Sequence, residues 1–217
     1  MPLFTEENRA KSRDGSKVQT RRLVKPQPDM SILTNPEMTV EFRRCPILGA
    51  THHPSEWGMY SKCASVGSVP IYGYNNPIKV GDVRYLCEPL TKGWCKLFAG
   101  RALAYYADDE HIAGGRHLID WRWKVNTLSS MFMPKEAART FFEITEVRVE
   151  RLHDISCADA IAEGIRAESN YESIDCDTPS PIDGFERLWD SINKKKCPWS
   201  SNPWVWVYGY KKVDINE

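Results

Sequence analysis

Residues 140–152 read TFFEITEVRVERL, the longest strand candidate in the chain. The apolar residues change parity along this run, because Phe142 and Ile144 are even-numbered whereas Val147 and Val149 are odd-numbered. A one-residue bulge between the two pairs would keep all four side chains on one buried face. Bulges of this kind occur where small barrels bend. The stretch therefore predicts a long, bent strand in a curved sheet.

Other parts of the chain also have strand-like or helix-like patterns. Thr5 can cap a short polar helix over residues 5–14, with Gly15 as its stop. Two capping boxes predict further helices, one formed by Ser156 and Asp159 before a stop at Gly164, the other by Asp183 and Glu186. The remaining strand candidates are 18–24, 78–86, 101–107 and 203–213.

Residues from about 26 to 77 differ from the rest of the chain. Half of the 14 prolines lie there, and no helical or strand period persists. We expect a long irregular insertion over a core that folds as one domain. Short, non-repeating strands with two or three helices favour an α+β fold, because a doubly wound sheet needs regular strand–helix alternation.

The bulk composition limits the classes of function. The chain has 217 residues, of which 41% are hydrophobic and 27% charged, so it can form a hydrophobic core. Its formal net charge of zero excludes a uniformly basic surface that coats nucleic acid. Any such contact needs a local patch, and seven basic residues with one acid lie between Arg9 and Lys25. A solvated face balanced by acids elsewhere explains that run equally well.

The cysteines and the N-terminal residues indicate the compartment. The seven cysteines have no regular spacing, and the N-terminal residues MPLFTEENRAKSRDG are polar. Together these two features predict free thiols in the cytoplasm. No apolar run is long enough to span a bilayer. Cys45, His52, His53 and Cys63 match no usual zinc spacing, so we expect neither a metal nor a cofactor.

Aromatic residues offer stacking surfaces for bases. Trp57, Tyr60, Tyr72 and Tyr74 in the insertion are the candidates for such contacts. The alternative is that these rings pack the insertion itself. The tryptophans near the C-terminus, such as Trp204, recur at core-like spacing.

Two segments could carry chemistry. Lys17 and Thr20 could act as base and nucleophile if burial or the neighbours Arg21 and Arg22 remove the lysine's proton. In an ideal strand the two side chains would point to opposite faces, so they converge only if Lys17 lies in the turn after Gly15. The alternative is an exposed strand edge.

Glu163 is the second chemical candidate. It falls in the last turn of the helix that Gly164 ends, where the helix dipole disfavours a carboxylate, and this suits a general acid. An ordinary exposed glutamate before a glycine cap is the alternative.

The stretch SKVQTRRLVKPQP at 16–28 resembles the start of ASCH-domain-like proteins of bacteriophages and prophages. Four further segments fit the same group: KVGDVRYLCEPL, FMPKEAARTFFEITEVRVERLHDIS, DAIAEGI and FERLWDSIN with NPWVWVYGYKKV. The resemblance implies a small PUA-like β-barrel with flanking helices. It covers most of the chain outside the insertion. The chain departs from the group at Val18 and at Cys87–Leu90, where only Glu88 of the usual Val-Arg-Glu-Thr-Trp remains.

One bacterial branch of this family removes acetyl from 4-acetylcytidine, and another is reported as a ribonuclease. The resemblance implies Lys17 as base, Thr20 as nucleophile and Glu163 as proton donor. Arg22 matches a family arginine, and Arg21, Arg22 and Glu88 are the implied substrate-binding residues.

Three functions stay open at this point. The first is a metal-independent hydrolase of a modified nucleoside, nucleotide or base. The second is a non-catalytic module that binds RNA or DNA, and a less favoured third is a nuclease. We expect no membrane partner.

Overall fold

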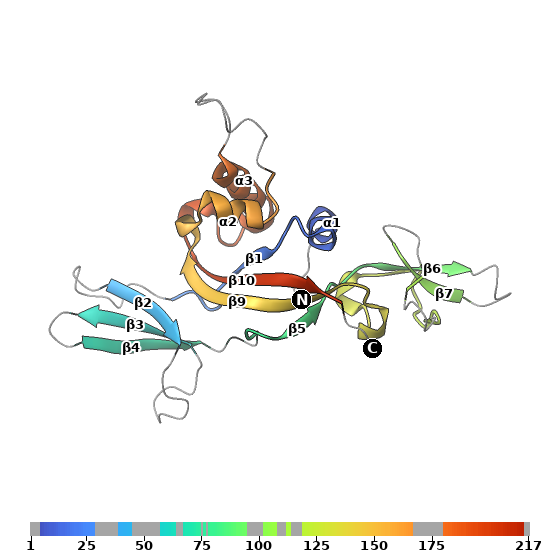
Figure 1. Cartoon of the computed structure of the whole chain (residues 1–217), viewed down its shortest axis with the longest axis horizontal. Helices are drawn as coiled ribbons and strands as arrows, with labels where there is room; N and C mark the ends of the chain where they lie inside the picture. Colours follow the sequence, from blue (N-terminus) through green and yellow to red (C-terminus); the bar gives the residue numbers. More distant parts are fainter. Residues whose placement is uncertain are drawn as a thin grey trace. The chain divides into compact units, whose positions relative to one another are not determined.

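The computed structural model describes residues 5–28, 39–44, 57–63, 67–74, 76, 78–94, 102–107, 112–113, 119–166 and 180–214. Within these residues the fold is mixed α+β, with a curled antiparallel half-barrel sheet and few helices (Figure 1). The sheet has the strand order β1-β10-β9-β5. None of the described helices is both long and apolar enough to cross a membrane.

The chain divides into two compact units, whereas the sequence analysis expected a single domain. The first unit comprises Met1–Val18, Gly81–Thr145 and Tyr210–Glu217, and the second comprises Gln19–Val80 and Glu146–Gly209. Strands β9 (Phe141–Arg151) and β10 (Trp204–Val213) contribute residues to both units. Each unit is described by itself below.

The first unit begins with α1 (Glu6–Asp14), which has the predicted ends. The Thr5 side chain accepts a hydrogen bond from Asn8 N–H at 3.3 Å, and Gly15 ends the helix with φ +85°. A left-handed residue at this position is easiest for glycine. The unit's other elements are β5 (Val83–Tyr85), β6 (Leu90–Trp94), β7 (Ala102–Tyr106), β8 (Thr127–Leu128) and the 3₁₀ helices η2 (Ser130–Phe132) and η3 (Lys135–Ala137).

A small antiparallel sheet with the order β7-β6-β8 has its own core in this unit. Its buried cluster consists of Leu90, Ala104, Tyr106, Ala113, Leu128, Met133 and Ala137. The predicted strand at 101–107 corresponds to β7, whereas sequence patterning missed β6 and β8. Both are short, and in β6 (LTKGW) Lys92 interrupts the face that Leu90 and Trp94 share, so no strong period marks this strand.

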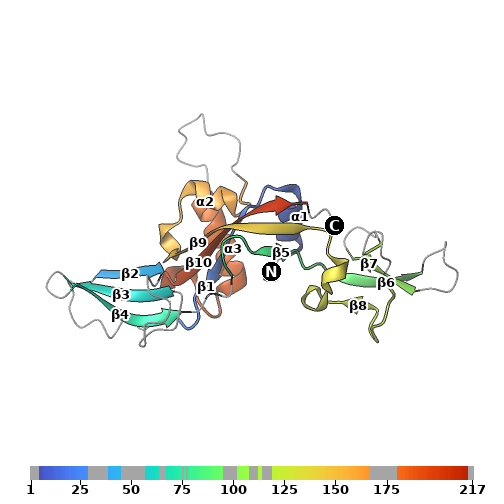
Figure 2. The same cartoon turned by 60° about the horizontal axis from the view of Figure 1, so that its bottom comes forward.

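The second unit contains β1 (Gln19–Leu23), β2 (Thr39–Arg44), β3 (Trp57–Cys63), β4 (Gly67–Tyr74), η4 (Leu152–Asp154), α2 (Cys157–Ala162), α3 (Pro181–Asn193) and η5 (Trp199–Ser201). Helices α2 and α3 lie over one face of β1, β9 and β10 (Figure 1). Strands β2, β3 and β4 form an antiparallel sheet with β3 in the middle (Figure 2).

The three-stranded sheet corrects the expectation of an irregular insertion at about 26–77. Residues 39–44, 57–63 and 67–74 are strands, and the rest of the range between 29 and 77, apart from residue 76, lies outside the described residues. The aromatic contact candidates are also corrected, because Trp57, Tyr60 and Tyr74 are buried. Trp57 packs edge-on against Trp206 of β10 at 5.3 Å between ring centroids. The side chain of Tyr72 lies outside the described residues.

The two faces of β1 have different surroundings. Arg21 is opposite Val207 and Leu23 is opposite Val205, on the face that packs against α3. Thr20 is opposite Tyr208, and Arg22 opposite Trp206, on the other face. Directly opposed residues in an antiparallel pair share a face, and neighbours along a strand alternate. Thr20 and Arg22 therefore share a face of β1.

The long strand and the first helix after it match their predicted positions closely. Burial along β9 follows the predicted change of parity, with Phe142, Ile144 and Val147 buried. Helix α2 starts from the capping box of Ser156 and Asp159. Helix α3 starts earlier than predicted.

The start of α3 is a correction. The side chain of Ser180 accepts a hydrogen bond from Ile182 N–H at 3.2 Å, and Asp183 is the third residue of that capping box. Pro181 occupies the first helical position, where a missing N–H costs nothing. The predicted pair of Asp183 and Glu186 is therefore one turn too late.

Candidate functional site

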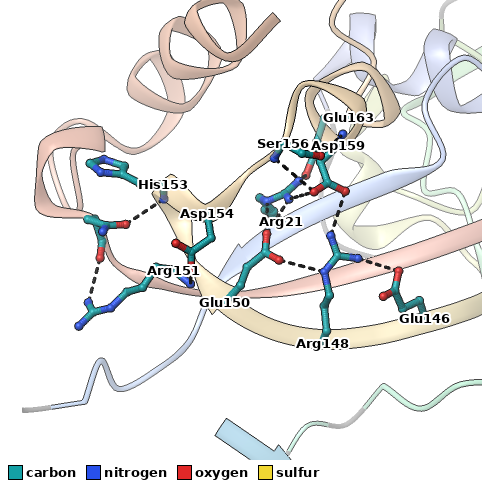
Figure 3. Close-up of polar contacts among 11 residues, drawn as sticks. Arg21, Glu146, Arg148, Glu150, Arg151, His153, Asp154, Ser156, Asp159 and Glu163 are labelled. Atoms are coloured by element: carbon teal, nitrogen blue, oxygen red, sulfur yellow. Dashed lines mark hydrogen bonds and ion pairs between the residues drawn. The ribbon is translucent and has the colours of Figure 1, made fainter. Parts of the chain in front are cut away.

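Arg21 is the centre of a charged cluster in the second unit (Figure 3). Its side chain is 1% exposed, and Nη2 lies 2.6 Å from Oε1 of Glu150 and 3.3 Å from Oδ2 of Asp159. Nη1 lies 3.3 Å from Oε1 of Glu163. The Arg21 guanidinium carbon is 5.6 Å from the centre of the Phe185 ring. This side chain therefore ties β1 to β9, α2 and α3.

Arg148 contacts two of the same carboxylates, those of Glu150 and Asp159, from the solvent side. Its guanidinium lies 2.7 Å from Glu146, 2.9 Å from Glu150 and 2.9 Å from Asp159. The side chain of Arg148 is 29% exposed, so water screens it more than it screens Arg21. Two guanidiniums thus contact four carboxylates, and the cluster as a whole is acidic.

Asp159 has both a local and a tertiary role. Within α2 it accepts from the backbone N–H of Ser156 at 3.4 Å, which completes the capping box. Burial alone would raise the pKa of Asp159. The hydrogen bond with Gln19 and the charges of Arg21 and Arg148 outweigh burial and lower that pKa from 3.8 to about 2. The carboxylate is therefore ionised at neutral pH and holds α2 against β1.

A second set of contacts fixes the chain next to this cluster (Figure 3). Arg151 donates to the backbone oxygen of Asn202 at 2.9 Å, and His153 N–H donates to the side-chain oxygen of Asn202 at 2.9 Å. Asn202 has φ +41°, a left-handed value that asparagine tolerates better than most residues. These contacts hold the turn before β10 against the end of β9.

A cavity of about 310 Å³ lies between β1 and α3. Arg21, Arg22, Leu23 and Lys25 line it from the β1 side, and Trp189 and Asn193 line it from α3. Arg21 is engaged by carboxylates, and Arg22 lies opposite Trp206 on the other face of β1, so the exposed Lys25 supplies the cavity's cationic character. Trp189 and Leu23 give it an apolar wall. The cavity can therefore accept a small group that is partly apolar and partly anionic.

Thr20 and Glu163 are associated with different faces of β1. Arg21, the partner of Glu163, projects toward α2 and α3, whereas Thr20 lies opposite Tyr208 on the other face. The Tyr208 hydroxyl hydrogen-bonds to Asn76 Oδ1 at 3.0 Å. Both Thr20 and Glu163 are buried, at 4% and 3% exposure. The structure brings Arg21 and Glu163 together, and it leaves the joint role of Thr20 and Glu163 as a prediction.

Lys17 belongs to the first unit and follows the turn at Gly15. Its backbone N–H donates to the oxygen of Lys11 at 3.0 Å, and its side chain is almost completely buried. Lysine is one of the residues least often buried in this way. The alternative of an exposed strand edge is therefore wrong for Lys17 and, from its burial, for Thr20.

The predicted basic patch between Arg9 and Lys25 is not one exposed surface. Lys11 pairs with Glu7 at 2.6 Å, Arg13 pairs with Glu88, and Arg21 is surrounded by carboxylates. The other members include Arg9 and Lys17, which are buried, and Lys25, which is exposed. Most of these basic side chains are therefore buried or paired with acidic side chains of the same protein.

Glu88, a predicted substrate-binding residue, has a structural environment in the first unit. Its side chain is fully buried and lies within 2.8 Å of Nη2 of Arg139, and it also pairs with Arg13. Arg139 stacks over the Tyr106 ring, 3.8 Å from the ring centre. Glu88 therefore joins α1 to the segment before β9.

Sequence analysis missed Arg148, Glu150 and Asp159 as members of the cluster. The signal was present in β9, where charged residues at 146, 148 and 150 recur with the period of a strand face. Asp159 was assigned only to its capping box. Its pairing with β1 joins segments far apart in the sequence, which local patterns do not reveal.

Within the described residues, no group of three or more His, Cys, Asp or Glu side chains is placed to hold a metal ion. Cys45, His52 and His53 lie outside the described residues, as does the side chain of Cys63. Comparison with protein-family models, curated proteins and solved structures finds no match. The resemblance to ASCH-domain proteins thus stays a prediction, and function is argued from geometry.

Proposed function

We propose that the chain binds a nucleic acid or nucleotide through the cavity between β1 and α3. The observation that carries the proposal is the lining of the cavity, where the exposed Lys25 stands beside Trp189 and Asn193. Cations recognise phosphate, an indole ring offers apolar contact to a base or sugar, and an amide can donate and accept hydrogen bonds. This combination of chemistry suits a phosphate-bearing ligand with an aromatic group.

Additional positive charge lies next to the cavity in the chain. Lys194, Lys195 and Lys196 follow Asn193 directly at the end of α3, and all three are exposed. The nearby Asp190 accepts a hydrogen bond from Trp199 N–H at 2.7 Å, so its carboxylate is engaged with the protein. A polyanion that extends beyond the cavity would therefore meet lysines.

The salt dependence of binding tests this proposal. We expect the double variant Lys25→Ala/Lys195→Ala to bind a fluorescent 12-nucleotide RNA or DNA more weakly than the wild type. The plot of log affinity against log salt concentration should become less steep, by about one unit of slope for each phosphate contact that the variant loses. Fluorescence anisotropy between low and moderate salt measures both quantities.

Lys211→Ala is the matched control for this experiment. Lys211 is 60% exposed and pairs with Glu143 at 2.9 Å in the first unit. Its removal should leave both affinity and salt slope unchanged. Equal slopes for the wild type and the double variant, or no binding by the wild type at low salt, would contradict the cavity as a phosphate site.

Hydrolysis of a modified nucleoside is the second candidate function. The burial of Lys17, Thr20 and Glu163, at 2%, 4% and 3% exposure, favours it. Buried ionisable groups cluster at functional sites more often than elsewhere. Binding is proposed first because Thr20 and the partner of Glu163 project from opposite faces of β1.

Thr20→Ala separates the two candidates. If Thr20 is a nucleophile, this variant should lose turnover of an acylated nucleoside such as 4-acetylcytidine and should keep its affinity for the nucleoside. Product formation measured by chromatography, with equilibrium binding in parallel, gives both quantities. Thr20→Ser keeps a hydroxyl and should retain part of the turnover. Absence of turnover by the wild type on a panel of acylated nucleosides would remove the hydrolase candidate.

A further inference from the structure

Two tryptophans flank one alanine on the small sheet of the first unit. Ala102 of β7 is opposite Trp94 of β6. On its other side, the bridge between Leu103 and Asp120 and the hydrogen bond from Trp121 N–H to Ala102 oxygen at 2.9 Å put Trp121 opposite Ala102. Directly opposed residues share a face of the sheet. Trp94 and Trp121 therefore project from the same face, with a methyl group between them.

The backbone spacing leaves room for a planar group between these rings. Neighbouring strands lie about 4.8 Å apart, so the backbones that carry Trp94 and Trp121 are about 10 Å apart. A ring stacked between two others needs about 3.5–4 Å on each side. The interval with Ala102 as its floor thus matches one aromatic ring.

The ring of Trp121 is held in place by its neighbours, whereas the ring of Trp94 is exposed. The Trp121 indole N–H donates to the oxygen of Val125 at 2.9 Å, and its ring contacts Trp123 edge-on at 4.9 Å. Trp94 is 65% exposed, which is unusual for so large an apolar side chain. An exposed ring on the same face of the sheet as a ring that is already held is a surface suited to stacking.

The strand that carries Trp94 is supported from its other face. A side chain at Gly93 would lie 2.4 Å from the ring of Tyr105, because that ring packs across the glycine. Only glycine permits this close approach. The support fixes β6 beneath the exposed ring.

Positive charges lie next to the slot. Lys92 Nζ is 5.2 Å from the centre of the Trp94 ring, and Arg122 lies 5.4 Å from the Trp123 ring. With Lys124, residues 90–94 and 119–128 contain three cations and one acid, Asp120. Asp120 is opposite Leu103, so it is associated with the other face. Lys92 shares the face of Trp94, so this face carries a cation that can contact a phosphate.

We propose that the slot between Trp94 and Trp121 binds one base of a single-stranded nucleic acid, with a phosphate near Lys92. Bases of a duplex are stacked on their neighbours and cannot enter such a slot, whereas an unpaired base can. This site lies in the first unit and is separate from the cavity between β1 and α3. It therefore adds strand selectivity that the cavity alone does not supply.

The test compares single-stranded and duplex oligonucleotides of equal length. We expect Trp94→Ala to weaken single-strand binding by about 5- to 100-fold and to change duplex binding less than twofold. Trp94→Phe keeps a ring and should recover most of the affinity. Fluorescence anisotropy with labelled oligonucleotides measures each affinity.

Phe132→Ala is the matched control, because Phe132 is 64% exposed in the same unit but lies outside the slot. It should leave both affinities unchanged, and circular dichroism should show that every variant folds. If Trp94→Ala weakened single-strand and duplex binding equally, or weakened neither, the proposed base-binding slot would be ruled out. The Lys25→Ala/Lys195→Ala variant tests the cavity independently of the slot. If that variant binds as tightly as the wild type while Trp94→Ala loses single-strand affinity, the cavity proposal fails and the slot proposal stands.

Discussion

Replacing Arg21 with methionine should lower the free energy of unfolding by about 3–5 kcal/mol. Methionine keeps most of the apolar stem but removes the charge that faces Glu150, Asp159 and Glu163. Because the side chains of Arg21 and Glu163 are 1% and 4% exposed, the carboxylate of Glu163 would lose the positive charge of Arg21 where water hardly reaches. Chemical denaturation followed by tryptophan fluorescence measures the change.

Arg148→Met is the matched control for Arg21→Met. Arg148 contacts Glu150 and Asp159 as well, but its side chain is 29% exposed. Water can replace much of its charge, so we expect a loss of about 1 kcal/mol or less. Similar losses for the two variants would mean that burial does not set the strength of this cluster.

The sequence predicted elements whose signals are local. The cap at Thr5 and the stop at Gly15 defined α1, and the parity change across β9 matched the burial of Phe142, Ile144 and Val147. Such signals depend on residues three or four apart, or on the period of a strand. Elements predicted in this way form in the folded protein because tertiary packing buries the same faces that the local pattern marks as apolar.

The sheet of β2, β3 and β4 was missed because its sequence contains residues that weaken strand patterns. Pro70 lies within β4, opposite Tyr60, where the register with β3 shifts between Met59 and Tyr60. Proline lacks the N–H that a regular ladder needs, and strands tolerate it at such irregularities. The position of Gly73 opposite Gly58 weakens the period further. Pairing across the hairpin, which a linear pattern does not show, stabilises these strands.

The candidate site was only partly visible in the sequence. Arg21 and Arg22 were both singled out, and the alternation of β1 explains why their roles differ. Arg21 turns to carboxylates on β9 and α2, and Arg22 lies opposite Trp206. The cavity joins β1 to a helix about 170 residues later, and no local pattern links segments at that separation.

Glu88→Gln should destabilise the protein by about 2–4 kcal/mol, although the two side chains have nearly the same shape. Glu88 is fully buried and accepts from Arg139 through both oxygens, with Nε–Oε2 at 3.1 Å and Nη2–Oε1 at 2.8 Å. Glutamine would present N–H donors to the guanidinium of Arg139 or Arg13. Donors would then face donors, and the two arginines would lose the negative charge of Glu88.

The exposure of the partners limits the effect of Glu88→Gln. Arg13 and Arg139 are each 26% exposed, so water can solvate part of the charge that glutamine leaves behind. Glu146→Gln is the matched control, because Glu146 is 51% exposed and its pair with Arg148 should contribute less than about 1 kcal/mol. Urea denaturation of the two variants measures the difference. If both lost the same stability, Glu88 would not hold α1 against the segment before β9, and a role in ligand binding would become the better explanation for its burial.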